Sequence, residues 1–265
     1  NTLIESYANY FEFEVINDCS MGVQGACSEI RINGQSVSLD QAHHLRVNDR
    51  IELFNNTHGA ILYLAMAGGF TATEVLGSTA TDIANGLGGL NGLPFTSKDI
   101  LKGSKFNMPR HTRSIPEGLS SRRYFSKNVT VHVIAGPEAY LFTKEVIDNF
   151  YSHAFLLSAE ISRVGYRLTG YPIHADSYNI PSKTVLPGTI QIPPSGDPII
   201  LMADGPVTGG YPRMGVVAKV DQPILAQLRS GGRVRFLACL PEEARLREAN
   251  QRQWIEELYH KKTER

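Results

Sequence analysis

The same order of elements occurs twice along this chain. Residues 49–70 read DRIELFNNTHGAILYLAMAGGF, where an alternating apolar segment, a turn and a continuous apolar run end at Gly-Gly-aromatic. Residues 188–211, GTIQIPPSGDPIILMADGPVTGGY, follow the same order. Because repeated elements indicate repeated structural units, we expect two similar β-rich units in tandem. Short strands separated by glycine and proline turns favour barrels or sandwiches.

This pattern divides the chain into four segments. Residues 1–105 form the first domain, a polar and basic connector covers 106–128, and the second domain covers 129–240. Residues 241–265 have acidic residues in their first turn and lysines near their end, an order that suits the dipole of a helix. We expect this C-terminal helix to dock on its own domain; a helix that binds a partner protein is the alternative.

A few shorter helices are expected beside the strands. Phe142, Val146 and Phe150 recur every four residues and form an apolar stripe that predicts a helix. Pro137 follows Gly136, and proline at the first helical position is a start signal. The glycine-rich segment 86–99 has little periodicity and predicts a loop.

Composition excludes several classes of protein. The sequence has 26 Lys and Arg residues and 26 Asp and Glu residues, so its formal net charge is zero. Such a chain lacks the basic surface that is typical of nucleic-acid-binding proteins. The longest apolar run, 60–67, is shorter than the roughly 20 residues of a membrane span. The 3 cysteines are too few and too scattered for a disulfide framework or a zinc site. We therefore expect a cytoplasmic protein that binds no membrane, nucleic acid or metal.

The segment that ends the second repeat is the best candidate for a ligand site. Asp204 follows an apolar strand, and Thr208 and Tyr211 flank Gly209 and Gly210. Glycines reach backbone conformations closed to other residues and let a ligand approach the main chain. Exposed amides in such a turn bind anions or carbonyl oxygens. The alternative is a tight connection that requires glycine and binds nothing.

A second candidate lies in SRVGYRLTG, at residues 162–170. Arg163 and Arg167 offer guanidinium groups, which bind carboxylates bidentately, and Tyr166 lies between them. The alternative is a strand with exposed basic positions. Motifs of other chemistries, such as the phosphate-binding loop GxxxxGK[ST], the nucleophile elbow GxSxG and the zinc motif HExxH, do not occur in the sequence.

With these residues described, the chain resembles a known family. The family contains the C subunit of ATP-dependent 5-oxoprolinase (also described as allophanate hydrolase subunit 2), an antagonist of a histidine-kinase inhibitor, and part of the carboxyltransferase domain of urea carboxylase. The matching motifs are AGGF at 67–70, LGS at 76–78, GLGG at 86–89, RVGYRLTG at 163–170, LPGTIQIPPSGDPIILMAD at 186–204 and TGGYPR at 208–213. The resemblance covers roughly residues 1–240, and the run from 186 to 213 is its most specific part.

The resemblance implies a mainly β fold, two tandem cyclophilin-like β-barrel domains with a few flanking helices and the C-terminal helix. It implies a 5-oxoprolinase-type hydrolase that opens the lactam of 5-oxoproline to glutamate with ATP, in complex with a related cyclophilin-like partner subunit. Carried onto matching positions, the catalytic residues are Asp204, Gln191 and Tyr211. The substrate-binding residues are Arg163, Tyr166, Arg167, Thr208, Gly209 and Gly210.

Two alternatives belong to the same resemblance. One is a carboxyltransferase subunit of a biotin-dependent enzyme of the urea carboxylase type, with biotin supplied by another chain. The other is a non-catalytic regulator of a kinase inhibitor. The family also carries an N-terminal segment, rich in Gly and Arg, before the part that matches Asn1. Its members have Thr-Thr-Gly-Gly-Tyr-Pro where this chain has Val207 and Thr208.

Overall fold

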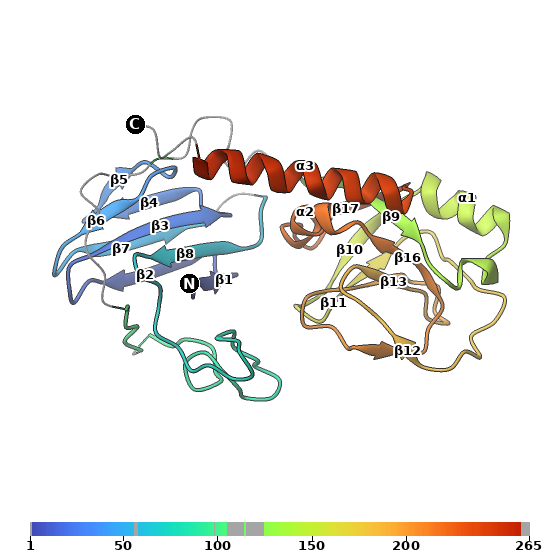
Figure 1. Cartoon of the computed structure of the whole chain (residues 1–265), viewed down its shortest axis with the longest axis horizontal. Coiled ribbons are helices and arrows are strands. Elements are labelled where there is room, and N and C mark those ends of the chain that lie inside the picture. The colour runs from blue at the N-terminus through green and yellow to red at the C-terminus, as the bar shows by residue number, and fades with distance from the viewer. Residues whose placement is uncertain (1, 56–57, 98, 105–113, 115–124, 261–265) are drawn as a thin grey trace. The chain divides into compact units, whose positions relative to one another are not determined.

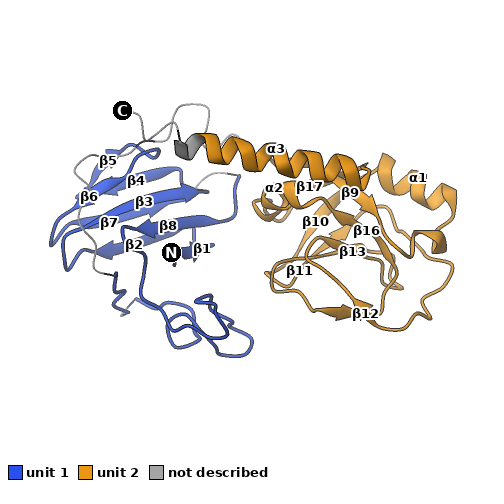
Figure 2. Ribbon diagram, viewed as in Figure 1, with its two compact units in different colours: residues 1–125 blue, residues 126–265 orange. Residues whose placement is uncertain are grey.

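The structure is a computed structural model that describes residues 2–55, 58–97, 99–104, 114 and 125–260. The chain divides into two compact units, Asn1–Phe125 and Ser126–Arg265 (Figures 1 and 2). This division falls inside the predicted connector 106–128, most of which lies outside the described residues. The predicted domain bounds therefore stay predictions, and each unit is described by itself.

The described residues of unit 1 form eight short strands, which are arranged as two four-stranded sheets. One sheet has the order β1-β8-β3-β6 and the other β2-β7-β4-β5. Buried residues from both sheets, such as Val23 on β3 and Ile51 on β7, belong to one core. The strand bounds are β1 Ile4–Ser6, β2 Tyr10–Glu14, β3 Cys19–Gly25, β4 Glu29–Ile32, β5 Gln35–Val37, β6 His43–Leu45, β7 Arg50–Phe54 and β8 Leu62–Met66.

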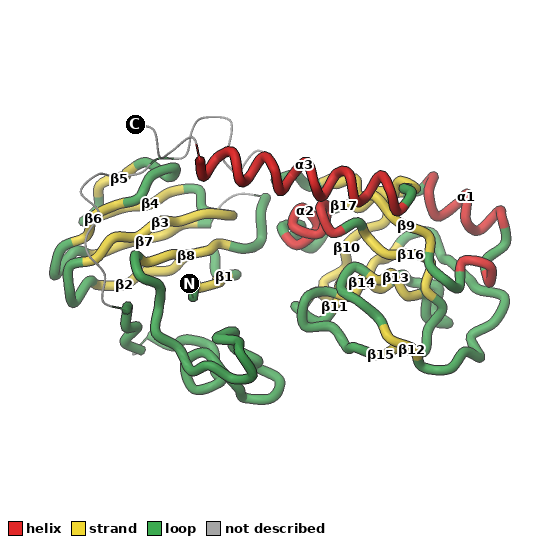
Figure 3. Tube along the Cα trace, viewed as in Figure 1, coloured by secondary structure: helices red, strands yellow, loops and turns green. Residues whose placement is uncertain are grey.

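The glycine-rich part of unit 1 forms loops, as predicted for 86–99. Isolated bridges such as Thr73↔Gly89 and Asp82↔Leu87 join successive turns there, and the segment after β8 is drawn as a long loop in Figure 3. Gly88 has a φ of 69° and Gly89 a φ of 53°, a region that favours glycine. Backbone conformation and close contacts both require glycine here, since a methyl group on Gly89 would lie 1.9 Å from Thr81 Oγ1.

Unit 2 is a closed barrel of seven strands in the order β10-β11-β14-β13-β16-β9-β17. The parallel pairing of β17 with β9, from Arg233↔Asn128 to Ala238↔Val133, completes the ring. Alternate residues of β9 point inward, which is the period of two that its sequence predicts. The strand bounds are β9 Asn128–Ala135, β10 Ala154–Ile161, β11 Gly165–Thr169, β13 Thr189–Gln191, β14 Ile199–Leu201, β16 Arg213–Val217 and β17 Arg233–Ala238.

A small ribbon lies outside this barrel's hydrogen-bonded ring. It pairs β12, Lys183–Thr184, with β15, Thr208–Gly209, and forms a sheet of its own (Figure 3). The ribbon carries the first half of the Thr-Gly-Gly-Tyr motif. The segment that the sequence predicts as a ligand site therefore begins in a two-stranded sheet that is separate from the barrel sheet.

The predicted helix around residues 142–150 is confirmed, but its predicted start is wrong. Pro137 precedes a short 3₁₀ helix, η2 at Ala139–Leu141, and α1 begins only at Lys144–Ser152. Thr143 caps α1, because its Oγ1 accepts a hydrogen bond from the Val146 amide at 3.3 Å. A side-chain cap therefore sets this start. Phe150 then stacks on Phe236 of the barrel with centroids 4.5 Å apart.

The remaining helices also belong to unit 2. A 3₁₀ turn, η3 at Lys219–Asp221, leads into α2, Gln222–Ala226, and α3 spans Pro241–His260. Near its start, α3 packs Ala244 with Ala218 and Cys239 of the same unit. No described helix is long and apolar enough to span a membrane. The predicted mainly β fold with a barrel and a C-terminal helix is confirmed.

Candidate functional site

The Thr-Gly-Gly-Tyr segment is held by the β12–β15 ribbon. Lys183 lies opposite Gly209 and Thr184 opposite Thr208. The Val185 amide donates to the Val207 carbonyl at 3.0 Å and extends the pairing by one bond. The ribbon therefore presents Gly209 with a lysine directly across from it.

Gln191 lies beneath Gly209. It ends β13, is only 5% exposed, and its side-chain Nε2 has no hydrogen-bond partner among the residues that the structure describes. A methyl group on Gly209 would lie 2.3 Å from that nitrogen, well inside van der Waals contact. A buried donor without an acceptor costs about 1–3 kcal/mol, and the described residues supply no acceptor for Nε2.

The reason for glycine at this position differs from the sequence expectation. Neither Gly209 nor Gly210 has a positive φ, so an unusual backbone conformation does not explain them. Gly209 is required because the amide of Gln191 fills the space of a side chain. Gly210 has its nearest atoms at 3.9 and 4.0 Å, so it has room for a methyl group.

A buried carboxylate, which the sequence reasoning missed, lies next to this ribbon. Glu138 is 1% exposed; its Oε2 accepts from Arg213 Nε at 2.5 Å, and its Oε1 accepts from Arg213 Nη2 at 2.7 Å and Lys183 Nζ at 3.1 Å. The Arg213 hydrogen bonds are the main cause that lowers the pKa of Glu138 from 4.5 to about 2. The carboxylate is therefore charged at neutral pH, and the same pair raises the pKa of Arg213.

The only sequence signal for this cluster was Arg213, the last residue of TGGYPR. Glu138 stands 75 positions earlier, after Gly136-Pro137, where the sequence pattern suggested only the start of a helix. Nothing local distinguishes a buried carboxylate from a solvated one. The closure of the barrel brings the two residues together.

Asp204 and Arg163, two predicted site residues, form a bidentate ion pair. Arg163 Nε lies 2.5 Å from Asp204 Oδ2, and Nη2 lies 3.0 Å from Oδ1. The side chain of Arg163 is 36% exposed and that of Asp204 is 44% exposed. The Asp204 amide also donates to the Arg163 carbonyl at 2.9 Å, so backbone and side chains join the two segments. Arg163 thus holds a carboxylate, but that carboxylate belongs to the protein.

The other predicted residues are more dispersed. Tyr166 is 4% exposed, lies in the barrel core and donates its hydroxyl to the Ala226 carbonyl at 3.1 Å. Arg167 Nε lies 2.8 Å from Glu160 on the neighbouring strand. Thr208 and Tyr211 are exposed at the ribbon. The ribbon and Gln191 thus form one cluster, while Tyr166 faces the core and Arg167 pairs along the barrel wall.

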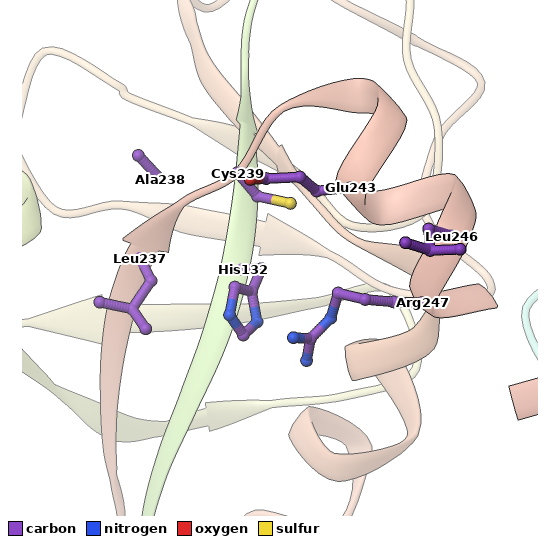
Figure 4. A pocket seen from close by; sticks show the side chains of 7 residues that line it. All are labelled: His132, Leu237, Ala238, Cys239, Glu243, Leu246 and Arg247. Atoms are coloured by element: carbon purple, nitrogen blue, oxygen red, sulfur yellow. The ribbon is translucent and has the colours of Figure 1, made fainter. Parts of the chain in front are cut away.

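A separate cavity lies where α3 crosses β9 and β17 (Figure 4). It is lined by His132, Leu237, Ala238, Cys239, Glu243, Leu246 and Arg247, none of them a predicted site residue. Buried Asp221 lies 2.7 Å from His132 Nδ1 and 3.4 Å from Arg247 Nη2. These contacts join the start of α3 to the barrel. The described residues contain no group of three His, Cys, Asp or Glu side chains that could hold a metal ion.

Residues 1–238 match the family model of the carboxyltransferase domain, subdomain A and B. The chain belongs to this family. It is 32% identical over 248 residues to the C subunit of 5-oxoprolinase from Escherichia coli (strain K12), a match that covers 93% of this chain and 77% of that protein. The predicted family resemblance is confirmed.

Longer relatives contain the same region as one part. The chain is 26% identical to urea amidolyase of Lachancea kluyveri, covering 94% of this chain but 14% of that protein. The crystal structure of the K. lactis urea amidolyase superposes with a TM-score of 0.85 at 23% identity, covering 93% of this chain and 16% of that one. The chain therefore spans 14–16% of the length of these relatives, and the second likeness shows the shared fold.

Proposed function

We propose that this chain is a subunit of an ATP-dependent 5-oxoprolinase, which opens the lactam of 5-oxoproline to glutamate. The observation that carries the proposal is the 32% identity to the C subunit of 5-oxoprolinase over 93% of the chain. That relative is named as a subunit, which supports a partner chain. We propose a partner of related cyclophilin-like fold, with ATP as co-substrate.

The chemistry of the substrate fits the unpaired donor of the site. A lactam is stabilised by resonance, so its ring opens readily only when its oxygen is activated. Transfer of a phosphoryl group from ATP to that oxygen releases ADP. Water then adds to the ring carbon, and the C–N bond breaks to give the free amine and an acyl phosphate. A second water hydrolyses the acyl phosphate to glutamate and phosphate. Gln191 Nε2, buried and without a partner among the described residues, would donate a hydrogen bond to the lactam oxygen and orient the ring.

The remaining predicted roles follow from exposure and charge. The Arg163–Asp204 pair is more than one-third exposed on both sides, so a substrate carboxylate could exchange with Asp204 for the guanidinium. The hydroxyl of Thr208 and the phenol of Tyr211 lie at the exposed end of the ribbon, where they would contact the ring. Tyr166 would act only by supporting the barrel wall.

A carboxyltransferase subunit is the second candidate, favoured by the 26% identity to urea amidolyase over 94% of the chain. The ureido ring of biotin also carries a carbonyl oxygen, so Gln191 Nε2 fits it equally well. When bound, biotin would supply the carboxyl group, and this chain would hold its ring. Another chain would carry the biotin.

The test is glutamate release from 5-oxoproline and ATP by the full-length protein, alone and with its partner subunit. We expect turnover only with the partner, and we expect Gln191→Ala to raise KM. The matched control is Asp148→Asn, which removes an exposed pair with Lys144 on α1.

Three outcomes would count against this function. Absence of turnover with the partner present would overturn it. If biotinylated chains co-purify in a streptavidin blot and carboxyl transfer to urea is measured, the second candidate holds. Tight partner binding without either reaction would favour the regulator of a kinase inhibitor.

A further inference from the structure

The β12–β15 ribbon is too small to hold its own position. Each strand has two residues, and the described part of the chain gives the ribbon no hydrogen-bonded place in the barrel sheet. Isolated two-stranded ribbons are at best marginally stable in water. Backbone hydrogen bonds tie the chain to the barrel near the ends of the ribbon, as from the Ile192 amide to the Pro212 carbonyl at 2.9 Å. Between these points, side chains hold Gly209 over Gln191.

Two side chains of one cross-strand pair reach the two strands of the ribbon. Gln191 on β13 and Arg213 on β16 are direct partners in the barrel. Gln191 packs against Gly209 of β15, while Arg213 donates from Nη1 to the Thr184 carbonyl of β12 at 2.9 Å. Residues directly opposite in an antiparallel pair are neighbours on one face of the sheet. The barrel wall thus holds the ribbon at two adjacent points.

Glu138 determines where the second of these points lies. Both of its oxygens bind Arg213, and Oε1 also binds Lys183, which lies opposite Gly209. The carboxylate is fully buried, whereas Lys183 is 46% exposed at its side chain. A bidentate carboxylate orients a guanidinium more firmly than a single bond, so Arg213 keeps its third donor aimed at Thr184.

We propose that Glu138 is the positioning residue of the Gln191–Gly209 site. Through Arg213 and Lys183 it holds the ribbon against Gln191, next to the amide that would donate to an acceptor oxygen of the ligand. The identity of that oxygen as the lactam carbonyl rests on the proposed function. The positioning itself does not.

The test measures amide hydrogen exchange in the full chain, comparing residues 181–186 and 205–211 with the core strand β9. Local opening sets exchange rates in weakly held segments. We expect Glu138→Gln to accelerate exchange at the ribbon about tenfold or more, with β9 as protected as in the wild type. Asp148→Asn, on the exposed face of α1, is the matched control and leaves both segments unchanged.

Lys183→Met covers the case in which Glu138→Gln fails to fold, because Lys183 is half-exposed and contributes one bond. It should accelerate ribbon exchange less than Glu138→Gln, and Lys183→Arg should restore protection. Unchanged ribbon exchange in Glu138→Gln and in Lys183→Met would overturn the proposal. Equal acceleration in the ribbon and β9 would also overturn it, because the cluster would then stabilise the whole barrel.

A double-mutant cycle in the complex connects the position to the ligand. If Glu138 acts through Gln191, Glu138→Gln raises KM for 5-oxoproline when Gln191 is present. In a Gln191→Ala background, the same substitution should cause no further rise in KM. Additive effects on KM would contradict that connection. Absence of 5-oxoproline turnover in the wild-type complex would reject the proposed function, and hydrogen exchange would still decide the positioning.

Discussion

The two glycines of the Thr-Gly-Gly-Tyr segment should respond oppositely to alanine. In Gly209→Ala, the new methyl group would lie 2.3 Å from Gln191 Nε2, so the amide must move by more than 1 Å to reach ordinary contact. Gln191 is 5% exposed and has little room to move. Overpacking of this kind costs about 1–3 kcal/mol.

Gly210→Ala provides the matched comparison one residue away. Its methyl group would meet nothing closer than 3.9 Å, and its φ is not positive. Replacing glycine by alanine at a compatible position stabilises by about 0.4–1 kcal/mol, because the unfolded chain loses conformational freedom. The two variants should therefore differ by about 2 kcal/mol or more in their free energy of unfolding.

The assay is equilibrium urea unfolding of the full chain, followed by circular dichroism. A third variant tests the cause, since Gln191→Ala removes the amide that the methyl group would meet. In the Gln191→Ala background, Gly209→Ala should destabilise by about 1 kcal/mol less than it does alone. Equal stability of Gly209→Ala and Gly210→Ala, or an unchanged effect of Gly209→Ala without the glutamine, would refute the reasoning.

Three further predictions concern charge and capping in unit 2. The pKa of Glu138 is lowered from 4.5 to about 2, so the stability it contributes is complete above the higher value and is lost as the pH falls to the lower one. Urea titrations at a series of acidic pH values should show that the wild type loses about 3 kcal/mol of its free energy of unfolding over this range. Glu138→Gln should not show this loss. Asp204→Asn should change the free energy of unfolding by less than about 1 kcal/mol, because its pair with Arg163 is exposed, and a larger loss would contradict this. The same variant should lower KM for 5-oxoproline, because the substrate carboxylate would no longer compete with a charged Asp204 for Arg163; a raised KM would contradict that role. Thr143→Ala should destabilise by about 1 kcal/mol in the same urea assay through the lost cap on Val146, and Thr143→Ser should restore it.

Much of the candidate site could be named from its local motif. Gln191 and Gly209 lie in the run 186–213, and the structure places them against each other. The physical role of Gly209 could not be read from that motif, because a glycine required by backbone conformation and one required by a neighbouring side chain look alike in sequence. Tyr166 shows the reverse problem, since its position between two arginines suggested a ligand and the structure places it in the core.

The sequence by itself determined several of the strands and turns and the helix around residues 142–150. These features depend on residues that are near one another in the chain: the alternation in β9, the stripe of α1 and the glycines of the long loop. Only the tertiary structure decided which charges are buried and paired. Glu138 and Arg213 meet across 75 positions because β9 and β16 are neighbours in the closed barrel. Burial then makes their pairing strong, since a charge removed from water requires a partner.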